Sequence, residues 1–190
     1  MESDSILPQL LPQLLLQLVL IAVNALFAAT EIAVISLNET KVRRMAEGGD
    51  RKAAKMLRMV TEPTGFLSTI QICITLAGFL GSAFAADNFS DKLVNWLIND
   101  CEVSGVSPSA LDTISVIIIT LVLSYFTLVL GELVPKRIAM KRSESIARAV
   151  SGLMIAMTAA LRPIIWLLTV STNGVLRLCG IDPEDNAEEV

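Results

Sequence analysis

The chain has 190 residues, of which 53% are hydrophobic, only 18% are charged and none is histidine, and its formal net charge is -4. Soluble domains carry about 25% charged residues, whereas here the apolar residues form blocks long enough to cross a bilayer. We therefore predict an all-α integral membrane protein. The absence of histidine and the scattered positions of the 3 cysteines argue against a zinc or haem site and against paired disulfides.

The first apolar segment, residues 10–37, is long enough to span a membrane with some tilt. The chain starts with acidic residues, so a cleavable signal peptide is not expected. Asn24 and Glu31 lie two helical turns apart and share one helix face. Intramembrane ionisable residues usually face a partner, a cavity or an ion path. Glu31 is interpreted either as lining a polar cavity or as reaching the interface near a helix end.

Residues 38–60 are strongly basic, with a few apolar positions between the charges. The basic residues are Lys41, Arg43, Arg44, Arg51, Lys52, Lys55 and Arg58. Gly48 and Gly49 divide this stretch into two predicted amphipathic helices. Such helices suit a membrane surface with anionic lipid headgroups. The alternative is a solvated charged face that only sets the topology.

A second predicted span covers residues 66–86 and follows the turn-forming stretch 62–65. Small residues on this helix predict close packing against a neighbour. Thr75 and Gly78 also offer oxygen atoms, because an ion can bind a hydroxyl or a backbone carbonyl. Packing and ion binding both remain open for Gly78.

The third predicted span covers residues 113–134, where hydroxyl residues including Ser124 form a stripe that ends at Gly131. Pro135 has no N–H to donate to the carbonyl of Gly131 four residues back. Unless a neighbour takes up that carbonyl, it lies bare beside the Glu132 carboxylate, and two hard oxygen ligands suit a small divalent cation. The alternative is a simple ion pair between Glu132 and Lys136.

The segment 149–176 is apolar, but Arg162 and Pro163 interrupt it at its middle. A charge and a helix breaker at this depth predict two half-helices, 149–161 and 163–176, in a re-entrant hairpin. The last residues, 181–190, form an acidic tail.

The basic residues set the expected topology. Residues 37–62 hold seven Lys or Arg and residues 135–149 hold five, whereas residues 87–112 hold one. By the positive-inside rule, both basic stretches are cytoplasmic and the N-terminus is outside. The C-terminus is cytoplasmic if 149–176 is re-entrant and outside if that segment crosses.

The candidate ligands on the three predicted spans are all oxygen donors: Asn24, Glu31, Thr75, Gly78, Ser124, Gly131 and Glu132. This ligand type favours Mg²⁺, Ca²⁺ or Na⁺ over zinc or copper. No nucleophile–base arrangement or cofactor motif accompanies the two glutamates, so we do not expect an enzyme.

Two motifs resemble a known family. Gly131-Glu132-Leu133-Val134-Pro135-Lys136 resembles the Gly-Glu-(Ile/Leu/Val)-x-Pro-Lys signature of the cyclin-M (CNNM) and CorB/CorC magnesium-transporter family. The stretch from Asn24 to Ala33 resembles that family's first-helix motif, and the basic stretch resembles its inner-surface helices. Asn24, Gly131 and Glu132 match the family's positions, with Glu31 as an addition. Ala28 stands where relatives often have serine, and Ile74 and Gly78 stand near their asparagines.

The resemblance implies that residues 1–180 form the family's transmembrane domain, a homodimer in the plasma membrane that transports Mg²⁺, with Na⁺ exchange as the often proposed coupling. It also implies a cytoplasmic CBS-pair domain that binds ATP beyond the tail, so this chain is expected to be the isolated membrane portion. Membrane lipids are expected partners and nucleic acid is not. The alternative function is a Mg²⁺-binding membrane regulator or scaffold without transport activity.

Overall fold

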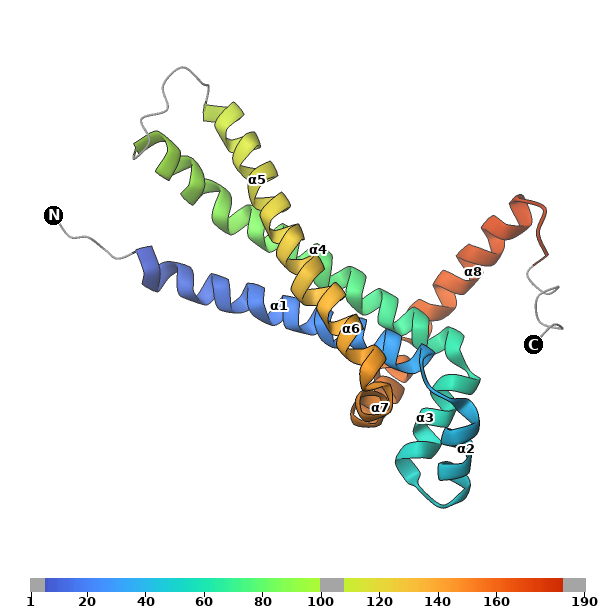
Figure 1. Ribbon diagram of the computed structural model, residues 1–190. Coiled ribbons are helices and arrows are strands. Elements are labelled where there is room, and N and C mark those ends of the chain that lie inside the picture. The colour runs from blue at the N-terminus through green and yellow to red at the C-terminus, as the bar shows by residue number, and fades with distance from the viewer. Residues whose placement is uncertain (1–5, 100–107, 183–190) are drawn as a thin grey trace. The chain divides into compact units, whose positions relative to one another are not determined.

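The computed structural model describes residues 6–99 and 108–182, and these residues form helices and no strand (Figure 1). Three helical stretches in this part are long and apolar enough to cross a membrane: Leu11–Ile35, Pro63–Ala85 and Ser109–Lys141. The predicted all-α membrane class with three spans is confirmed. The chain divides into two compact units, Met1–Leu37 with Ile70–Ala147 and Asn38–Thr69 with Arg148–Val190.

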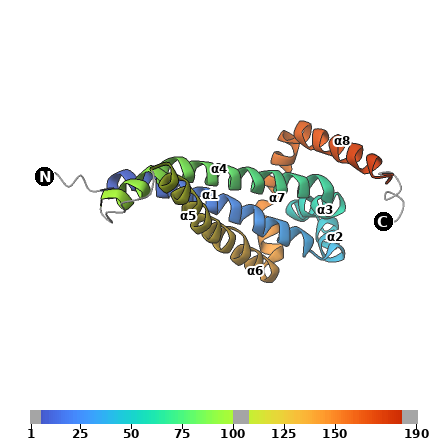
Figure 2. The same ribbon diagram turned by 90° about the horizontal axis from the view of Figure 1, so that it is seen from above.

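The first unit contains the three spans. Its elements are α1 (Ile6–Ile35), most of α4 (Pro63–Asn99), α5 (Pro108–Leu128), a π-helical turn η1 (Val129–Leu133) and α6 (Val134–Lys141). The first helix packs against η1 and α6, and α1 and α6 lie side by side in both ribbon views (Figures 1 and 2). This packing places the Gly131–Lys136 motif against the first helix.

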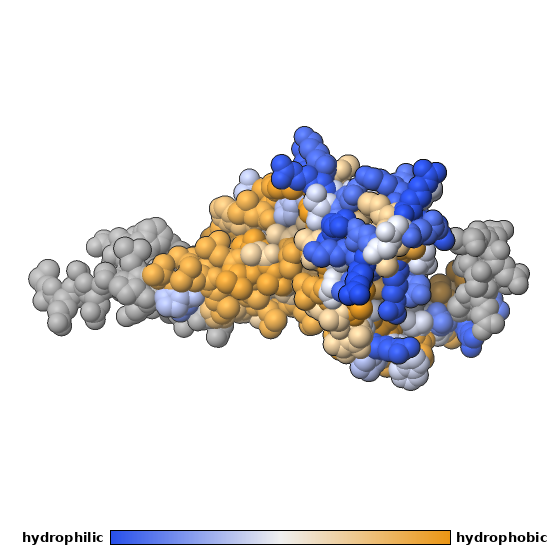
Figure 3. All heavy atoms as spheres, turned by 90° about the horizontal axis from the view of Figure 1, so that it is seen from below, coloured by the Kyte–Doolittle hydropathy of each residue, from blue (hydrophilic) through white to orange (hydrophobic). Residues whose placement is uncertain are grey.

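The long helices of the first unit present apolar side chains outward. Leu18, Phe79 and Leu121 are each more than half exposed. Figure 3 shows the resulting apolar surface, in orange, over the part of the molecule where α1, α4 and α5 lie. Lipid tails would cover such a surface, which agrees with the membrane assignment.

The second unit begins with two short amphipathic helices, α2 (Glu39–Glu47) and α3 (Arg51–Thr61). Asn38 caps α2 by accepting a hydrogen bond from the Lys41 N–H at 2.9 Å. Gly49 leaves the helix with φ of 89°, a conformation that favours glycine, and lets the chain turn into α3. The apolar faces of the pair supply the buried residues Val42, Met56 and Met59.

Asp50 joins the α2–α3 turn to helix α7 (Ser143–Ala160). Its carboxylate accepts hydrogen bonds from the backbone N–H groups of Lys52 and Ala53 and lies 2.6 Å from the Arg148 guanidinium. These hydrogen bonds hold the pKa of Asp50 below its ordinary value, and the one from the Ala53 N–H has the largest effect. A second link joins Thr69 of α4 to Thr158, whose hydroxyls are 2.9 Å apart. Helix α7 is therefore attached near both of its ends.

The two last helices are α7 (Ser143–Ala160) and α8 (Arg162–Leu178), and they meet at a bend of 68°. The break lies at Leu161, directly before Arg162 and Pro163, where the sequence predicted it. Whether the pair crosses the membrane or re-enters it stays a prediction. Helix α8 ends at Leu178, and Gly180 follows its C-cap with a φ of 78°, a conformation that favours glycine. Residues 183–190 of the predicted acidic tail lie outside the described residues.

Two spans extend beyond their predicted bounds. Helix α4 continues to Asn99 instead of ending near residue 86, and the third helical run continues through η1 and α6 to Lys141 instead of ending at residue 134. The second difference has a physical reason. The backbone changes to π-helical geometry over Val129–Leu133, which accommodates Pro135 in the first turn of α6, so the proline does not end the helical run. The Gly131–Lys136 motif therefore lies inside a continuous helical run.

Candidate cation site

The site is built around the π-turn η1. The N–H of Val134 donates to the carbonyl of Val129, five residues back, which is the spacing of a π-helix. Pro135 follows and has no N–H, so it donates to no carbonyl in the preceding turn. Single π-turns inside α-helices are frequent at functional sites because they redirect the residues that follow.

Asn24 of α1 takes up the carbonyl of Gly131. Its Nδ2 donates to that oxygen over 3.1 Å in a buried position. The sequence left open whether this carbonyl is bare, and the structure answers that a neighbour occupies it. A Cβ at residue 131 would lie 3.2 Å from Asn24 Nδ2, so only glycine allows this close approach without a shift. The other amide atom, Asn24 Oδ1, is buried and has no partner in the structure.

Lys136 joins two carboxylates from different helical segments. Its Nζ lies 2.9 Å from Glu132 Oε1 and 3.1 Å from Glu31 Oε2. The predicted Glu132–Lys136 pair is therefore present, and Glu31 of α1 joins it. The exposed fraction of the side chain is 36% for Glu132, 27% for Lys136 and 25% for Glu31. The cluster is therefore partly desolvated yet open to small ions. The sequence indicated Lys136 only as a partner of Glu132.

The amide and the charged cluster are two levels of one helix face. Asn24 and Glu31 are seven residues apart on α1, which corresponds to about 10.5 Å along the helix. On the facing segment, Gly131 accepts from Asn24, and Glu132 is joined to Glu31 through Lys136. A cation at the carboxylates would thus have a buried amide oxygen deeper along the same face.

The remaining predicted ligands lie elsewhere. Thr75 and Ser124 are exposed, and Thr75 pairs with Gln71 on its own helix at 3.4 Å. A Cβ at Gly78 would meet no atom within 4 Å, so this glycine faces open space. The structure therefore brings together Asn24, Glu31, Gly131 and Glu132, and in the described residues no hydrogen bond or ion pair links the other candidates to this cluster.

Carboxylates are few at the cluster. Among residues 6–99 and 108–182, no group of three or more His, Cys, Asp or Glu side chains could hold a metal ion. A divalent ion at Glu31 and Glu132 would need neutral oxygens or water for its remaining ligands. Mg²⁺ tolerates this arrangement because it usually keeps several waters and binds through one or two carboxylates.

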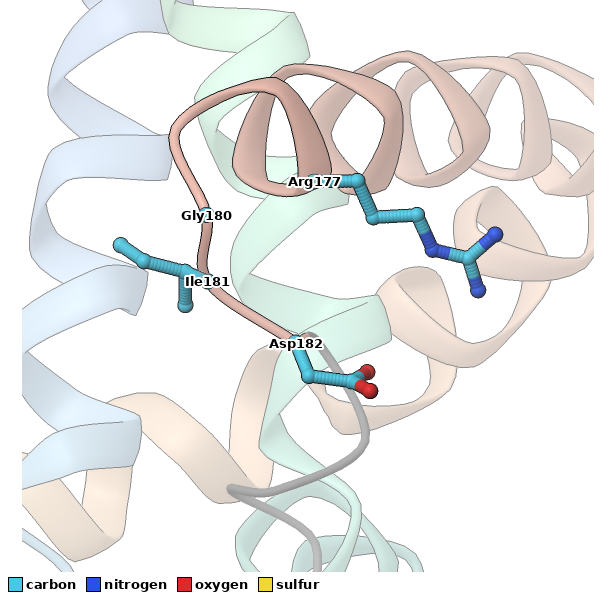
Figure 4. Close-up of a pocket in the computed structure, with 4 residues that line it drawn as sticks. All are labelled: Arg177, Gly180, Ile181 and Asp182. Carbon is cyan, nitrogen blue, oxygen red and sulfur yellow. The ribbon is translucent and has the colours of Figure 1, made fainter.

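An open depression lies at the C-terminal end of α8. Arg177, Gly180, Ile181 and Asp182 line it, with the Arg177 and Asp182 side chains extending to the same side (Figure 4). None of the residues predicted for the cation site borders it. The depression belongs to the second unit.

Fold and site together define a multi-pass helical membrane domain in which two carboxylates share one cationic group at a span end. The chain belongs to the cyclin M (CNNM) family, because residues 15–190 match its transmembrane N-terminal domain. The resemblance of the two sequence motifs is therefore confirmed.

Several curated proteins are similar to the chain. A UPF0053 protein of Synechocystis sp. is 36% identical over 167 residues, which cover 88% of this chain and 36% of that protein. The polyamine export protein of Haemophilus influenzae is 28% identical over 159 residues, 84% of this chain and 36% of that protein. A UPF0053 inner membrane protein of Escherichia coli is 28% identical over 160 residues, 84% of this chain and 33% of that protein. The chain thus spans about a third of the length of these relatives.

Proposed function

We propose that this domain moves Mg²⁺ across the membrane and that Glu31 and Glu132 bind the ion on its path. One observation carries the proposal: carboxylates from α1 and η1 converge on a single cationic atom, Lys136 Nζ, at 3.1 and 2.9 Å. Side chains that hold an ammonium between two carboxylates are already arranged to hold a cation. The two carboxylates carry two negative charges, which one Mg²⁺ balances and one ammonium does not.

Lys136 acts in this proposal as the internal competitor of the transported ion. When Mg²⁺ arrives, the ammonium leaves the carboxylates, and when Mg²⁺ departs, the ammonium returns. The charged pair is therefore never left without a counter-ion in a partly desolvated place, where an unpaired charge is costly. The lysine side chain is flexible enough to move within its reach.

The energetics of the ion favour a coupled mechanism for export. Moving one elementary charge across the membrane changes its free energy by about 2.3 kcal/mol per 100 mV of membrane potential. For the doubly charged Mg²⁺ the change is therefore about 4.6 kcal/mol per 100 mV. Inward movement needs no coupling, whereas export does, and exchange with entering Na⁺ is the coupling that we propose.

We propose that the domain lies in the plasma membrane with its N-terminus outside. Glu31 and Lys136 then lie at the cytoplasmic ends of their spans. In the full-length protein we propose a homodimer with an ATP-binding CBS-pair domain.

Binding and flux measurements test the site. Purified protein is titrated with Mg²⁺ by calorimetry, and proteoliposomes containing a Mg²⁺-sensitive dye report transport. We expect Glu132→Gln and Glu31→Gln each to lower Mg²⁺ affinity at least tenfold, whereas Glu39→Gln, on the exposed face of α2, keeps the wild-type value. Lys136→Met removes the competitor and should raise the equilibrium affinity. Wild-type affinity in both glutamate variants would remove the cluster from the ion site.

A second candidate substrate is an organic polyamine. The group held between Glu31 and Glu132 is a primary ammonium, the same group that ends a polyamine chain. The relative from Haemophilus influenzae is named a polyamine export protein. Counterflow of a labelled diamine in the same proteoliposomes distinguishes the two substrates. Failure to move either cation would instead support a regulator or scaffold that binds Mg²⁺ without transport.

A further inference from the structure

A row of polar residues follows one face of the first helix. Gln17, Asn24 and Glu31 are each seven residues apart, so they lie two helical turns from one another on nearly the same side of α1. Together they cover about 21 Å of helix length. Leu14, Leu18 and Val19 on the same helix are exposed and apolar, so this row lies on a helix whose exposed side chains are largely apolar.

Two of these residues bury an oxygen without a partner. Gln17 is 5% exposed and Asn24 is 4% exposed, and both Gln17 Oε1 and Asn24 Oδ1 lack any hydrogen bond. In the described residues only the hydroxyl of Ser115, on α5, shares this property. Leaving a buried amide oxygen unpaired costs about 1–3 kcal/mol. Such oxygens in a membrane protein point to a ligand that occupies them part of the time.

A glycine faces each of the two amides. A Cβ at Gly81 of α4 would lie 3.4 Å from Gln17 Nε2, and a Cβ at Gly131 would lie 3.2 Å from Asn24 Nδ2. Larger side chains at either glycine would press on the amide. The repeated pairing of an amide with a glycine indicates that Gln17 and Asn24 have equivalent places on the face of α1.

We propose that Gln17 is a further contact of the transported cation, one step from Asn24 toward the N-terminal end of α1. This rests on the proposed function of the Glu31–Glu132 site. Mg²⁺ gives up its waters reluctantly, and those waters are strong donors, so amide oxygens can accept from a hydrated ion without removing its shell. Neutral contacts bind weakly enough to release the ion to the next position, as multi-site conduction requires.

Three variants test Gln17 in Mg²⁺-dye proteoliposomes. Gln17→Met keeps the side-chain length but removes the oxygen, and we expect the maximal flux to fall about tenfold while Mg²⁺ binding at Glu31 and Glu132 stays within twofold. Gln17→Glu keeps the oxygen and adds charge, so the concentration for half-maximal flux should fall. Gln71→Met makes the same exchange at an exposed position of α4 and should match the wild type.

The outcomes separate the possible explanations. A purely structural Gln17 would lower thermal stability in Gln17→Met, whereas our proposal expects stability to stay or rise because an unpaired polar atom is removed. Wild-type flux in Gln17→Met would overturn the role of Gln17 and leave the carboxylate site intact. Absence of flux in the wild-type protein would instead overturn the proposed function itself.

Discussion

Two prolines, Pro135 and Pro163, lie in regions of helix that differ in whether the helical run continues. At Pro135 the helix continues, because the π-turn before it and the Asn24 amide satisfy the disturbed backbone. At Pro163 the run breaks, α7 and α8 bend by 68°, and Leu161 has no side-chain cap. The two prolines differ in their place in the helix: Pro135 lies within a run that continues beside a donor from a neighbouring helix, whereas Pro163 lies in the first turn of α8, after the break at Leu161.

The largest expected effect comes from removing that donor. Asn24→Asp keeps the shape of the side chain but loses the N–H that reaches the Gly131 carbonyl, and Asn24→Leu removes all polarity. We expect each to cost about 1–3 kcal/mol, since a buried carbonyl is left unpaired. Thermal unfolding in detergent measures the loss. Ser171→Ala, where an exposed hydroxyl bonds only to its own helix, is the control and should stay near wild type. Unchanged stability in both Asn24 variants would mean that the π-turn needs no outside donor.

A comparable effect is expected from adding a methyl group at the same contact. Gly131→Ala places a Cβ 3.2 Å from Asn24 Nδ2 and should destabilise by about 1–3 kcal/mol through overpacking. Gly78→Ala is the matched change where no atom lies within 4 Å, and it should stabilise by about 0.5–1 kcal/mol through helix propensity. Opposite signs in the two melting temperatures would support the contact, and equal shifts would argue against it.

Replacing each proline compares the two regions directly. Pro135→Ala adds an N–H that competes with Asn24 for the Gly131 carbonyl, so the turn can change register and move Glu132 relative to Glu31. We expect a severalfold loss of Mg²⁺ affinity. Pro163 lies in the first turn of α8, where backbone N–H groups lack helical partners, so Pro163→Ala should leave that affinity unchanged and the bend in place. Spin-label distances across α7 and α8 report the bend, and a straightened pair would contradict this.

The smallest effect concerns how α7 is held before its bend. Asp50 pairs with Arg148, and hydrogen bonds lower its pKa in the folded chain. A carboxyl whose folded pKa is depressed contributes stability above its unfolded pKa of about 3.9, and this contribution is lost as the pH falls through the lower folded value. An acid titration followed by circular dichroism should therefore show a transition that is weaker in Asp50→Asn. Identical curves would mean that the pair contributes no stability.

Much of this architecture could be predicted from local signals. The apolar blocks predicted three spans, Gly48 and Gly49 predicted two short basic helices, and Arg162 with Pro163 predicted the break. The Glu132–Lys136 pair was also an expectation, since four residues separate its partners on one helix.

The contacts between helices could not be predicted in the same way. The Asn24–Gly131 hydrogen bond joins residues 107 positions apart, and it depends on the rotation of two helices and on a π-turn. The spacing of Gly131 and Pro135 suggested a free carbonyl but did not identify its donor. The Glu31–Lys136 ion pair also depends on the rotation of two helices, so the sequence did not predict it. The seven-residue spacing of Gln17, Asn24 and Glu31 was the sequence signal that could have indicated the polar face of α1.

The long separation of Asn24 and Gly131 has a consequence for biosynthesis. Ribosomes add about 5–20 residues per second, so the 107 residues between the two take about 5 to 20 s to synthesise. Once the first helix has inserted, its Asn24 amide lacks the Gly131 carbonyl until the third span has been made. The nascent chain then needs a temporary partner for Asn24, from the insertion machinery or from water. Mutations that slow synthesis of the third span would prolong this exposed state without altering the finished fold.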